Sequence, residues 1–313
     1  MLTLFPKFKT RLILFEGLFV ALMAALYLLK PTMNPIAMIL MLIVGCLFIA
    51  AAQYINAANN ARILSEKRAR EGVTYEEAND KMFERNYFGM MMVETGEADA
   101  FITGLYTKYS NTIKVAKEVI GIRPEFKHFG TMHILNSKKG TYFLADTLIN
   151  RHPNAETLID IAKLSEYTVR FFNHTPVMAM LSYSNFGTDK EGSPVSVHEA
   201  VDYMQRNYPD LAIDGEMQVN FAMNRELRDA KYPFTRLKGK DVNTLIFPNL
   251  SSANSAYKLL QSMDMDSELI GPIQMGLNKP IHFTDFESSV RDIVNITAVA
   301  VIDAIVDKKK AGK

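Results

Sequence analysis

The sequence predicts an α/β protein with two lobes, in which largely parallel sheets carry helices on both faces, preceded by a helical hairpin in a membrane. Three observations support this prediction. Between residues 100 and 303, short apolar runs alternate with amphipathic segments, as in sheets whose parallel strands are joined by crossover helices. Residues 177–181 are apolar throughout, which is typical of a strand buried on both faces. Residues 35–52 carry no charge.

Two apolar stretches open the chain, at residues 12–29 and 35–52. The second runs for 18 residues without a charge and meets the length criterion for a transmembrane helix, and the first falls near its lower limit. Basic residues flank the pair, which places both ends in the cytoplasm. We therefore expect residues 1–59 to form a transmembrane hairpin that anchors a cytoplasmic body to the inner membrane through residues 12–52. The alternative is a buried pair of helices.

The region after residue 60 opens with two short helices. Gly72 ends the first, and Thr74 with Glu77 three residues later forms a capping box that starts the second. Further along, the pattern predicts strands at residues 90–93 and 100–103, a helix at 111–120, and a hairpin with strands at 131–135 and 141–145.

From residue 146, helices and strands alternate regularly. The expected strands are residues 177–181, 211–213, 242–247 and 269–273, and the expected helices are residues 154–172 and 195–207, one that starts at 251–254, and a long one from about 288. A ligand of a parallel sheet lies outside the carboxyl ends of its strands. The loop at residues 182–188 follows such an end and is rich in hydroxyls, so it could cradle a phosphate. Ordinary turn chemistry is the alternative.

Composition excludes several classes of protein. The 313 residues carry 35 Lys and Arg against 34 Asp and Glu, so the net charge of +1 gives no field for nucleic acid. The single cysteine, Cys46, excludes an intrachain disulfide and a cysteine cluster for zinc. The six histidines show no metal-ligand spacing, so no metal site is expected. No Gly-rich dinucleotide fingerprint follows a strand.

Several longer motifs follow one another toward the C-terminus. They are Asp214-Gly215-Glu216-Met217-Gln218, Leu245-Ile246-Phe247-Pro248-Asn249-Leu250, Asn254-Ser255-Ala256-Tyr257-Lys258-Leu259, Gly276-Leu277-Asn278-Lys279-Pro280 and Asp292-Ile293-Val294-Asn295. Together they resemble the phosphate acetyl/butyryltransferase family over about residues 61–305. Residues 93–100, 181–187 and 219–222 look most like the C-terminal phosphotransacetylase-like domain of bacterial NADP-dependent malic enzymes.

The resemblance implies a phosphotransacetylase-like domain at residues 60–313, with a truncated N-terminal lobe and a second lobe at about 146–288. It implies a CoA ester or acyl phosphate as partner, CoA or acetyl-CoA as ligand or substrate, no tightly bound cofactor, and a homodimer. Asp292 matches the aspartate that looks like the catalytic base of active transferases. The residues expected around the substrate are Ser182, Ser184, Asn249, Asn254, Lys279, Ser288 and Ser289.

The sequence departs from the family pattern at Asp285 and Phe286. Active transferases carry a serine and an arginine there. A guanidinium holds phosphate in a fixed fork, which phenylalanine cannot do. The resemblance therefore favours a regulatory domain that senses acetyl-CoA, without transferase activity. The alternatives are an active transferase that moves an acyl group between CoA and phosphate, and a membrane-tethered scaffold without a ligand.

Overall fold

The computed structural model describes residues 35–104, 107–263, 268–284 and 287–310. The chain divides into two compact units, Met1–Ala98 and Asp99–Lys313. The predicted division at residue 60, with a second lobe at 146–288, stays a prediction.

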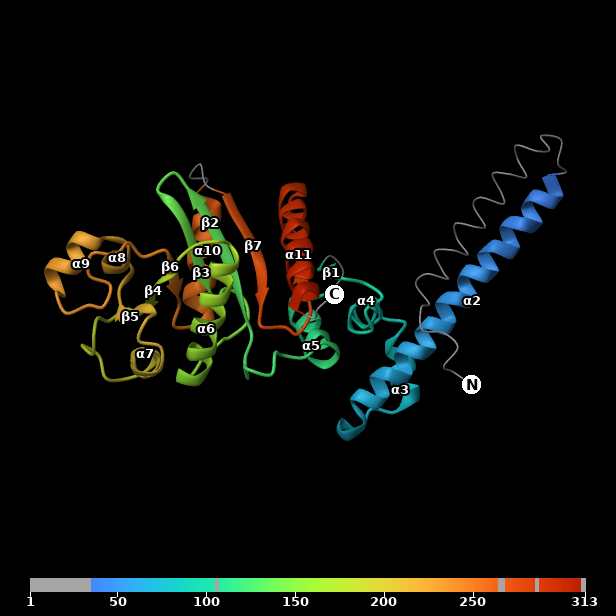
Figure 1. The fold of residues 1–313 in the computed structure, drawn as a ribbon, viewed down its shortest axis with the longest axis horizontal. Helices are drawn as coiled ribbons and strands as arrows, with labels where there is room; N and C mark the ends of the chain where they lie inside the picture. The colour runs from blue at the N-terminus through green and yellow to red at the C-terminus, as the bar shows by residue number, and fades with distance from the viewer. Residues whose placement is uncertain (1–34, 105–106, 264–267, 285–286, 311–313) are drawn as a thin grey trace. The chain divides into compact units, whose positions relative to one another are not determined.

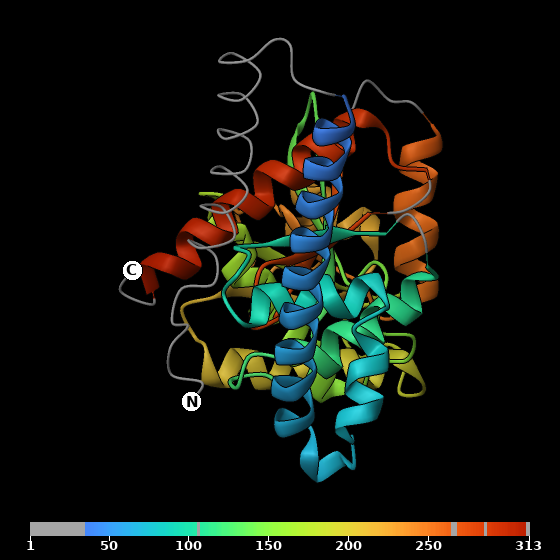
Figure 2. The same cartoon turned by 90° about the vertical axis from the view of Figure 1, so that its right-hand side faces the viewer.

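The described part of the first unit is helical. Helix α2 (Pro35–Lys67) is followed by a 3-10 turn η1 (Ala69–Glu71), α3 (Tyr75–Lys81) and α4 (Arg85–Glu94). Helix α3 packs beside the C-terminal half of α2 (Figure 1 and Figure 2). Small and apolar side chains that are buried in this unit include Ala61, Leu64, Ala78, Met90 and Met91.

Local chemistry explains where these helices begin and end. Gly72 takes the left-handed conformation, with φ of 82°, and closes η1. The Thr74 hydroxyl accepts the backbone N–H of Glu77 at 3.2 Å, which confirms the predicted helix start. The strand predicted at residues 90–93 is wrong, because these residues lie in α4. A short apolar run without alternation fits the buried side of a helix as well as a strand.

The predicted membrane hairpin needs correction. Its first stretch, residues 12–29, lies outside the described residues. The second stretch belongs to the 33-residue helix α2, which continues into a polar half that carries the buried residues Asn56 and Asn60. Among the residues that the structure describes, no helix is both long enough and apolar enough to cross a membrane.

A six-stranded sheet forms the centre of the second unit. Its order is β5 (Ala212–Met217), β4 (Val177–Leu181), β6 (Thr244–Ile246), β3 (Gly140–Ala145), β2 (Gly130–Ser137) and β7 (Glu268–Met275). A separate parallel pair joins β1 (Phe101–Thr103) to β8 (Ile281–Phe283). The helices of this unit are α5 (Tyr109–Val119), α6 (Ala155–Phe171), α7 (Ser193–Asn207), α8 (Val219–Met223), α9 (Arg225–Lys231), α10 (Leu250–Ser262) and α11 (Val290–Lys310).

The sheet is mixed rather than largely parallel, which corrects the prediction. Strands β3, β6, β4 and β5 run parallel, whereas β2 pairs antiparallel with both β3 and β7. The hairpin of β2 and β3 and the strand at residues 177–181 are confirmed. Because side chains alternate along a strand, the sheet has two apolar faces. Met178 and Met180 pack with α6 and α7, whereas Ala179 and Leu181 pack toward α8 and α10.

Candidate functional site

The carboxyl ends of β3, β6, β4 and β5 meet at one edge of the sheet, since these four strands are parallel. The residues that follow them are polar. Asp146 follows β3, Asn249 lies just beyond β6, and Ser182 and Ser184 follow β4. In parallel sheets this edge is where ligands bind. Of the predicted site residues, Ser182, Ser184, Asn249 and Asn254 lie on this edge or on the helix that starts there.

Glu216, at the end of β5, organises the serine-rich loop. Its carboxylate is fully buried and accepts the Gly187 N–H at 2.6 Å and the Ser184 hydroxyl at 3.3 Å. The backbone N–H groups of Ser182, Phe186 and Thr188 donate to backbone carbonyls of the protein. Those of Ser184 and Asn185 donate to side-chain hydroxyls. The role of Ser182 and Ser184 in substrate binding stays a prediction, and it rests on their hydroxyls rather than on backbone donors.

Asp146, which follows β3, is an anchor inside the protein. One carboxylate oxygen accepts the backbone N–H and the hydroxyl of Thr131, at 2.9 and 2.7 Å. The other accepts the backbone N–H and the side-chain amide of Asn150, at 2.6 and 2.7 Å. Sequence analysis missed both Asp146 and Glu216. For Asp146 the available signal was an acidic residue directly after an apolar strand, in Ala145-Asp146, whereas Glu216 lies inside β5 and was quoted only as part of a motif.

Helix α10 begins at this edge. The side chain of Asn249 caps it by accepting the Ser252 N–H at 3.0 Å, which is a structural role. Asn254 lies one turn into the helix, with its side-chain amide 3.4 Å from the Tyr257 hydroxyl. The other predicted role of both residues, binding a substrate, stays a prediction.

The next turn of α10 packs on a buried histidine. The rings of Tyr257 and His133 stack with 4.3 Å between centroids, and His133 Nδ1 lies 2.8 Å from the Thr147 hydroxyl. Burial lowers the pKa of His133 to about 3, and the positive charge of Lys258 adds to this effect. His133 is therefore neutral at physiological pH.

The start of α11 holds the residue predicted as a base. One carboxylate oxygen of Asp292 accepts both the backbone N–H and the hydroxyl of Ser289, each at 2.8 Å. The Ser289 hydroxyl in turn lies 3.2 Å from the Asp292 backbone N–H. This reciprocal pair is a capping box that starts the helix. Ser288 is half-buried beside it. Lys279 lies elsewhere, since its ammonium is 3.5 Å from Asp307 near the other end of α11.

A cavity of about 210 Å³ lies beside Asp292. It is bounded by the ends of β2 and α10, the beginning of β7 and the first turn of α11, and its polar wall contains Gln261, Glu268, Arg291 and Asp292. This volume fits a small organic group. Asp285 and Phe286, the two positions that depart from the family pattern, lie outside the described residues.

Arg291 in the wall of this cavity, and Lys258 on α10 outside that wall, each have an acidic partner. Arg291 Nε lies 2.8 Å from Glu268, which also accepts the side-chain amide of Asn295 at 3.0 Å. The Lys258 ammonium lies 2.8 Å from the Glu287 carboxylate, and this hydrogen bond with its charge lowers the pKa of Glu287. The second pair joins α10 to the segment before α11. It thereby links the helix that carries Asn254 to the helix that carries Asp292.

The predicted site residues thus form two groups. Ser182, Ser184, Asn249 and Asn254 belong to the edge of the sheet and to α10, whereas Ser288, Ser289 and Asp292 belong to the start of α11. Lys279 belongs to neither group. Within the described ranges, no group of three or more histidine, cysteine or acidic side chains is arranged to hold a metal ion.

The second unit is a mixed α/β domain with polar side chains at the ends of its parallel strands, an arrangement that it shares with solved phosphotransacetylases. The chain belongs to the phosphate acetyl/butaryl transferase family, whose model matches residues 43–301. The match begins inside the second apolar stretch, so part of that stretch is family sequence. This confirms the family that the motifs indicated.

Similar proteins fall into two groups. The chain is 38% identical over 236 residues to the NADP-dependent malic enzyme of Salmonella typhimurium, covering 75% of this chain and 31% of that protein. It is 34% identical over 251 residues to the phosphate acetyltransferase of Acetivibrio thermocellus, covering 78% of this chain and 75% of that protein. A solved phosphotransacetylase from Streptococcus pyogenes matches with a TM-score of 0.71 and 34% identity, over 76% of this chain and 72% of that one.

The chain spans about a third of the length of the malic enzymes that it matches. It spans about three quarters of the phosphate acetyltransferase of Acetivibrio thermocellus. Both groups share the domain, so the family alone does not decide between catalysis and regulation.

Proposed function

We propose that this domain binds a CoA ester in a regulatory role and does not turn it over as a transferase. The observation that carries the proposal is the charge at the Asp292 cavity. Among the described residues of its wall, Arg291 is engaged by the Glu268 carboxylate, and Asp292 adds a second acidic group. Such surroundings disfavour inorganic phosphate, which needs an excess of positive charge or free N–H donors.

The sequence supports the same proposal. Phe286 stands where active transferases carry an arginine, and Asp285 before it adds a further negative charge. The similarity to malic enzymes supports a regulatory role of this kind, with acetyl-CoA as the sensed ligand. The rival is an active transferase that uses Asp292 as base, which the similarity to phosphate acetyltransferases supports.

The test combines binding with turnover on the full chain. Calorimetry with acetyl-CoA and with CoA should show saturable binding, while acetyl phosphate formation from acetyl-CoA and phosphate should stay far below about 1 per second, an ordinary enzyme rate. Turnover at that rate would establish the active transferase instead. If the chain neither binds acetyl-CoA nor forms acetyl phosphate, the remaining reading is a scaffold without a ligand.

A double variant sharpens this test. Asp285→Ser with Phe286→Arg restores the residue types of active transferases and should raise acetyl phosphate formation at least tenfold. The matched control is the single change Phe286→Leu, which supplies no positive charge and should leave the rate at its starting level. An equal rate in the control would show that the guanidinium is not the missing element.

We further propose that the chain forms a homodimer through residues 146–288. Exposed apolar side chains gather on α8, α9 and the loop after them, namely Val219, Met223, Leu227 and Phe234. Exposed large apolar side chains on neighbouring short elements are a common feature of surfaces that a partner covers. Sedimentation of the full chain should give twice the monomer mass, and Leu227→Glu should shift the balance to monomer. A monomer at micromolar concentration in the unmodified chain would contradict the dimer.

A further inference from the structure

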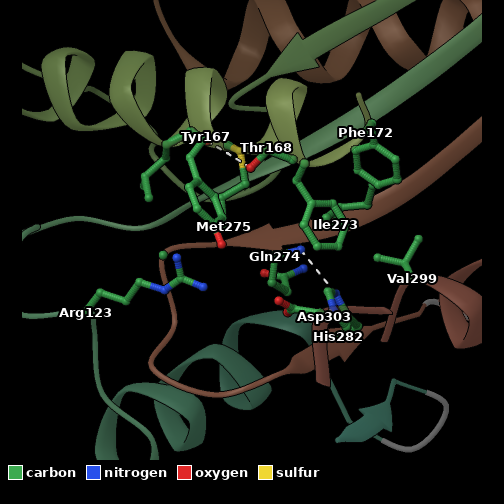
Figure 3. Close-up of a pocket in the computed structure, with 13 residues that line it drawn as sticks. Arg123, Tyr167, Thr168, Phe172, Ile273, Gln274, Met275, His282, Val299 and Asp303 are labelled. Atoms are coloured by element: carbon green, nitrogen blue, oxygen red, sulfur yellow. Dashed lines mark hydrogen bonds and ion pairs between the residues drawn. The ribbon is translucent and has the colours of Figure 1, made fainter. Parts of the chain in front are cut away.

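A second, smaller pocket lies between α6, α11 and the strands β7 and β8 (Figure 3). Its volume is about 30 Å³. The polar part of its wall is formed by Arg123, Tyr167, Thr168, Gln274, His282 and Asp303, and apolar side chains and Gly276 form the rest. Its wall contains none of the residues predicted for substrate binding or catalysis.

Two buried polar atoms in this wall have no hydrogen-bond partner among the described residues. They are Gln274 Oε1 and His282 Nε2. The exposed fractions of these residues are 7% for Gln274 and 1% for His282. His282 Nε2 lies 3.6 Å from Asp303 Oδ2, which is too long for a good hydrogen bond. Buried polar atoms are almost always paired, with protein or with ordered water.

The Gln274 amide leaves a polar atom for the pocket in either orientation. Its Nε2 lies 2.9 Å from the Tyr109 hydroxyl. A hydroxyl can donate or accept, so the oxygen and nitrogen of the amide could exchange places. In both cases one amide atom contacts Tyr109 and the other has no protein partner.

The protein backbone favours one tautomer of His282. The backbone N–H of Gln274 lies 3.5 Å from His282 Nδ1 and points to it as acceptor, and a ring that accepts there carries its proton on Nε2, which is then a donor. Figure 3 shows Gln274, His282 and Asp303 close together, with the guanidinium of Arg123 pointing into the pocket. Arg123 opposes a bound cation, and Asp303 opposes a bound anion. The wall therefore suits a small neutral molecule that both donates and accepts.

We propose that this pocket is a buried hydration site. One or two ordered water molecules accept the His282 Nε2–H and donate to Gln274 Oε1 and the Asp303 carboxylate. A water molecule needs roughly 10–15 Å³ of such volume and at least two polar partners, and the pocket offers both. The water joins β7, β8 and α11, and so helps to fix the rotation of α11, whose first turn carries Asp292.

The solution test counts long-lived internal waters in the full chain by oxygen-17 relaxation dispersion. Gln274→Met keeps the size of the side chain and removes its polar atoms, so the count should fall by at least one. Gln53→Met makes the same exchange at an exposed position of α2 and should leave the count unchanged. An unchanged count in a folded Gln274→Met variant would overturn the proposal.

A crystal structure of the unmodified chain tests the same site without a variant. The expected result is a water peak within roughly 3 Å of His282 Nε2, a normal hydrogen-bond distance. An empty pocket, or an ion in place of water, would overturn the proposal.

Discussion

The edge of the six-stranded sheet and the start of α11 use carboxylates in opposite ways. Asp146 at the sheet edge is buried and accepts hydrogen bonds from Thr131 and from the segment at residues 148–150. Asp292 is half-buried, its carboxylate accepts hydrogen bonds from Ser289 within the part of the chain that the structure describes, and it borders a cavity. A carboxylate whose oxygens accept several hydrogen bonds from the protein stabilises the fold, whereas one that accepts those of a local helix cap can still contact a ligand.

The same contrast holds for the basic and imidazole groups. His133 lies inside, neutral and stacked on Tyr257, whereas Lys258, the next residue of α10, reaches the surface and meets Glu287. Neighbouring positions of one helix thus serve the core and the candidate site. The comparison predicts large effects on folding at the sheet edge and small ones at α11.

The largest effect is expected for Asp146→Ala. The change leaves several buried donors without an acceptor, so it should lower the free energy of unfolding by about 3–5 kcal/mol. Chemical denaturation measures this loss. Asp210→Ala, at an exposed position, is the control and should change stability by less than about 0.5 kcal/mol. A similarly small loss of stability in both variants would contradict the structural role of Asp146.

His133 should make stability depend on pH. Its pKa is lowered from 6.5 to about 3, so the unfolded chain binds a proton that the folded chain does not between these values. Stability is therefore fully present above about pH 6.5 and falls as the pH drops toward 3, by up to roughly 5 kcal/mol at about 1.36 kcal/mol per pKa unit. His133→Gln should flatten this dependence, and the exposed His152→Gln should not. Equal slopes in the two variants would contradict the buried neutral state.

Gly271→Ala tests how tightly the sheet packs around the same histidine. A Cβ atom at Gly271 would lie 2.6 Å from the His133 ring, at a backbone φ of 152° that favours glycine. We expect a loss of about 2–3 kcal/mol. Gly140→Ala meets a similar φ of 136° with no atom within 4 Å, so it isolates the backbone strain. The difference between the two variants measures the contact with His133.

Particular residues show how far the sequence could predict this molecule. The strand at residues 177–181 has the bounds that the sequence predicts, because polar and turn residues on both sides limit its apolar run to the length of a strand. The run at residues 90–93 was misassigned, since Met90-Met91-Met92-Val93 has no period that separates helix from strand. The antiparallel pairing of β7 with β2 could not be predicted, because strand direction depends on the path of the whole chain.

The candidate site shows the same limit. Motifs located Ser289 and Asp292, and the spacing of these two residues already allowed a cap. Nothing in the sequence could tell that Lys258 and Arg291 are each engaged by a carboxylate, because those contacts join segments 23 to 29 residues apart. Asp146 and Glu216 were missed because their role depends on burial, which is a property of the folded chain.

The smallest effects are expected at the start of α11, where they separate a cap from a ligand site. Ser289→Ala removes the capping hydroxyl and should cost about 1 kcal/mol of unfolding free energy. Asp292→Asn keeps an acceptor for the Ser289 N–H but loses the negative charge that favours a helix N-terminus, so it should cost only a few tenths of a kcal/mol. Ser251→Ala, exposed on α10, is the control for a serine without this role.

Ligand binding should reverse this order. If the cavity beside Asp292 holds part of a CoA ester, Asp292→Asn should change the acetyl-CoA dissociation constant by at least threefold, which is larger than the change from Ser289→Ala. Thermal denaturation and calorimetry on the same three variants give both rankings. The contrary result is that Asp292→Asn is more destabilising than Ser289→Ala and leaves the affinity for acetyl-CoA unchanged. In that case Asp292 has a structural role, as Asp146 has, and the two regions use their carboxylates in the same way.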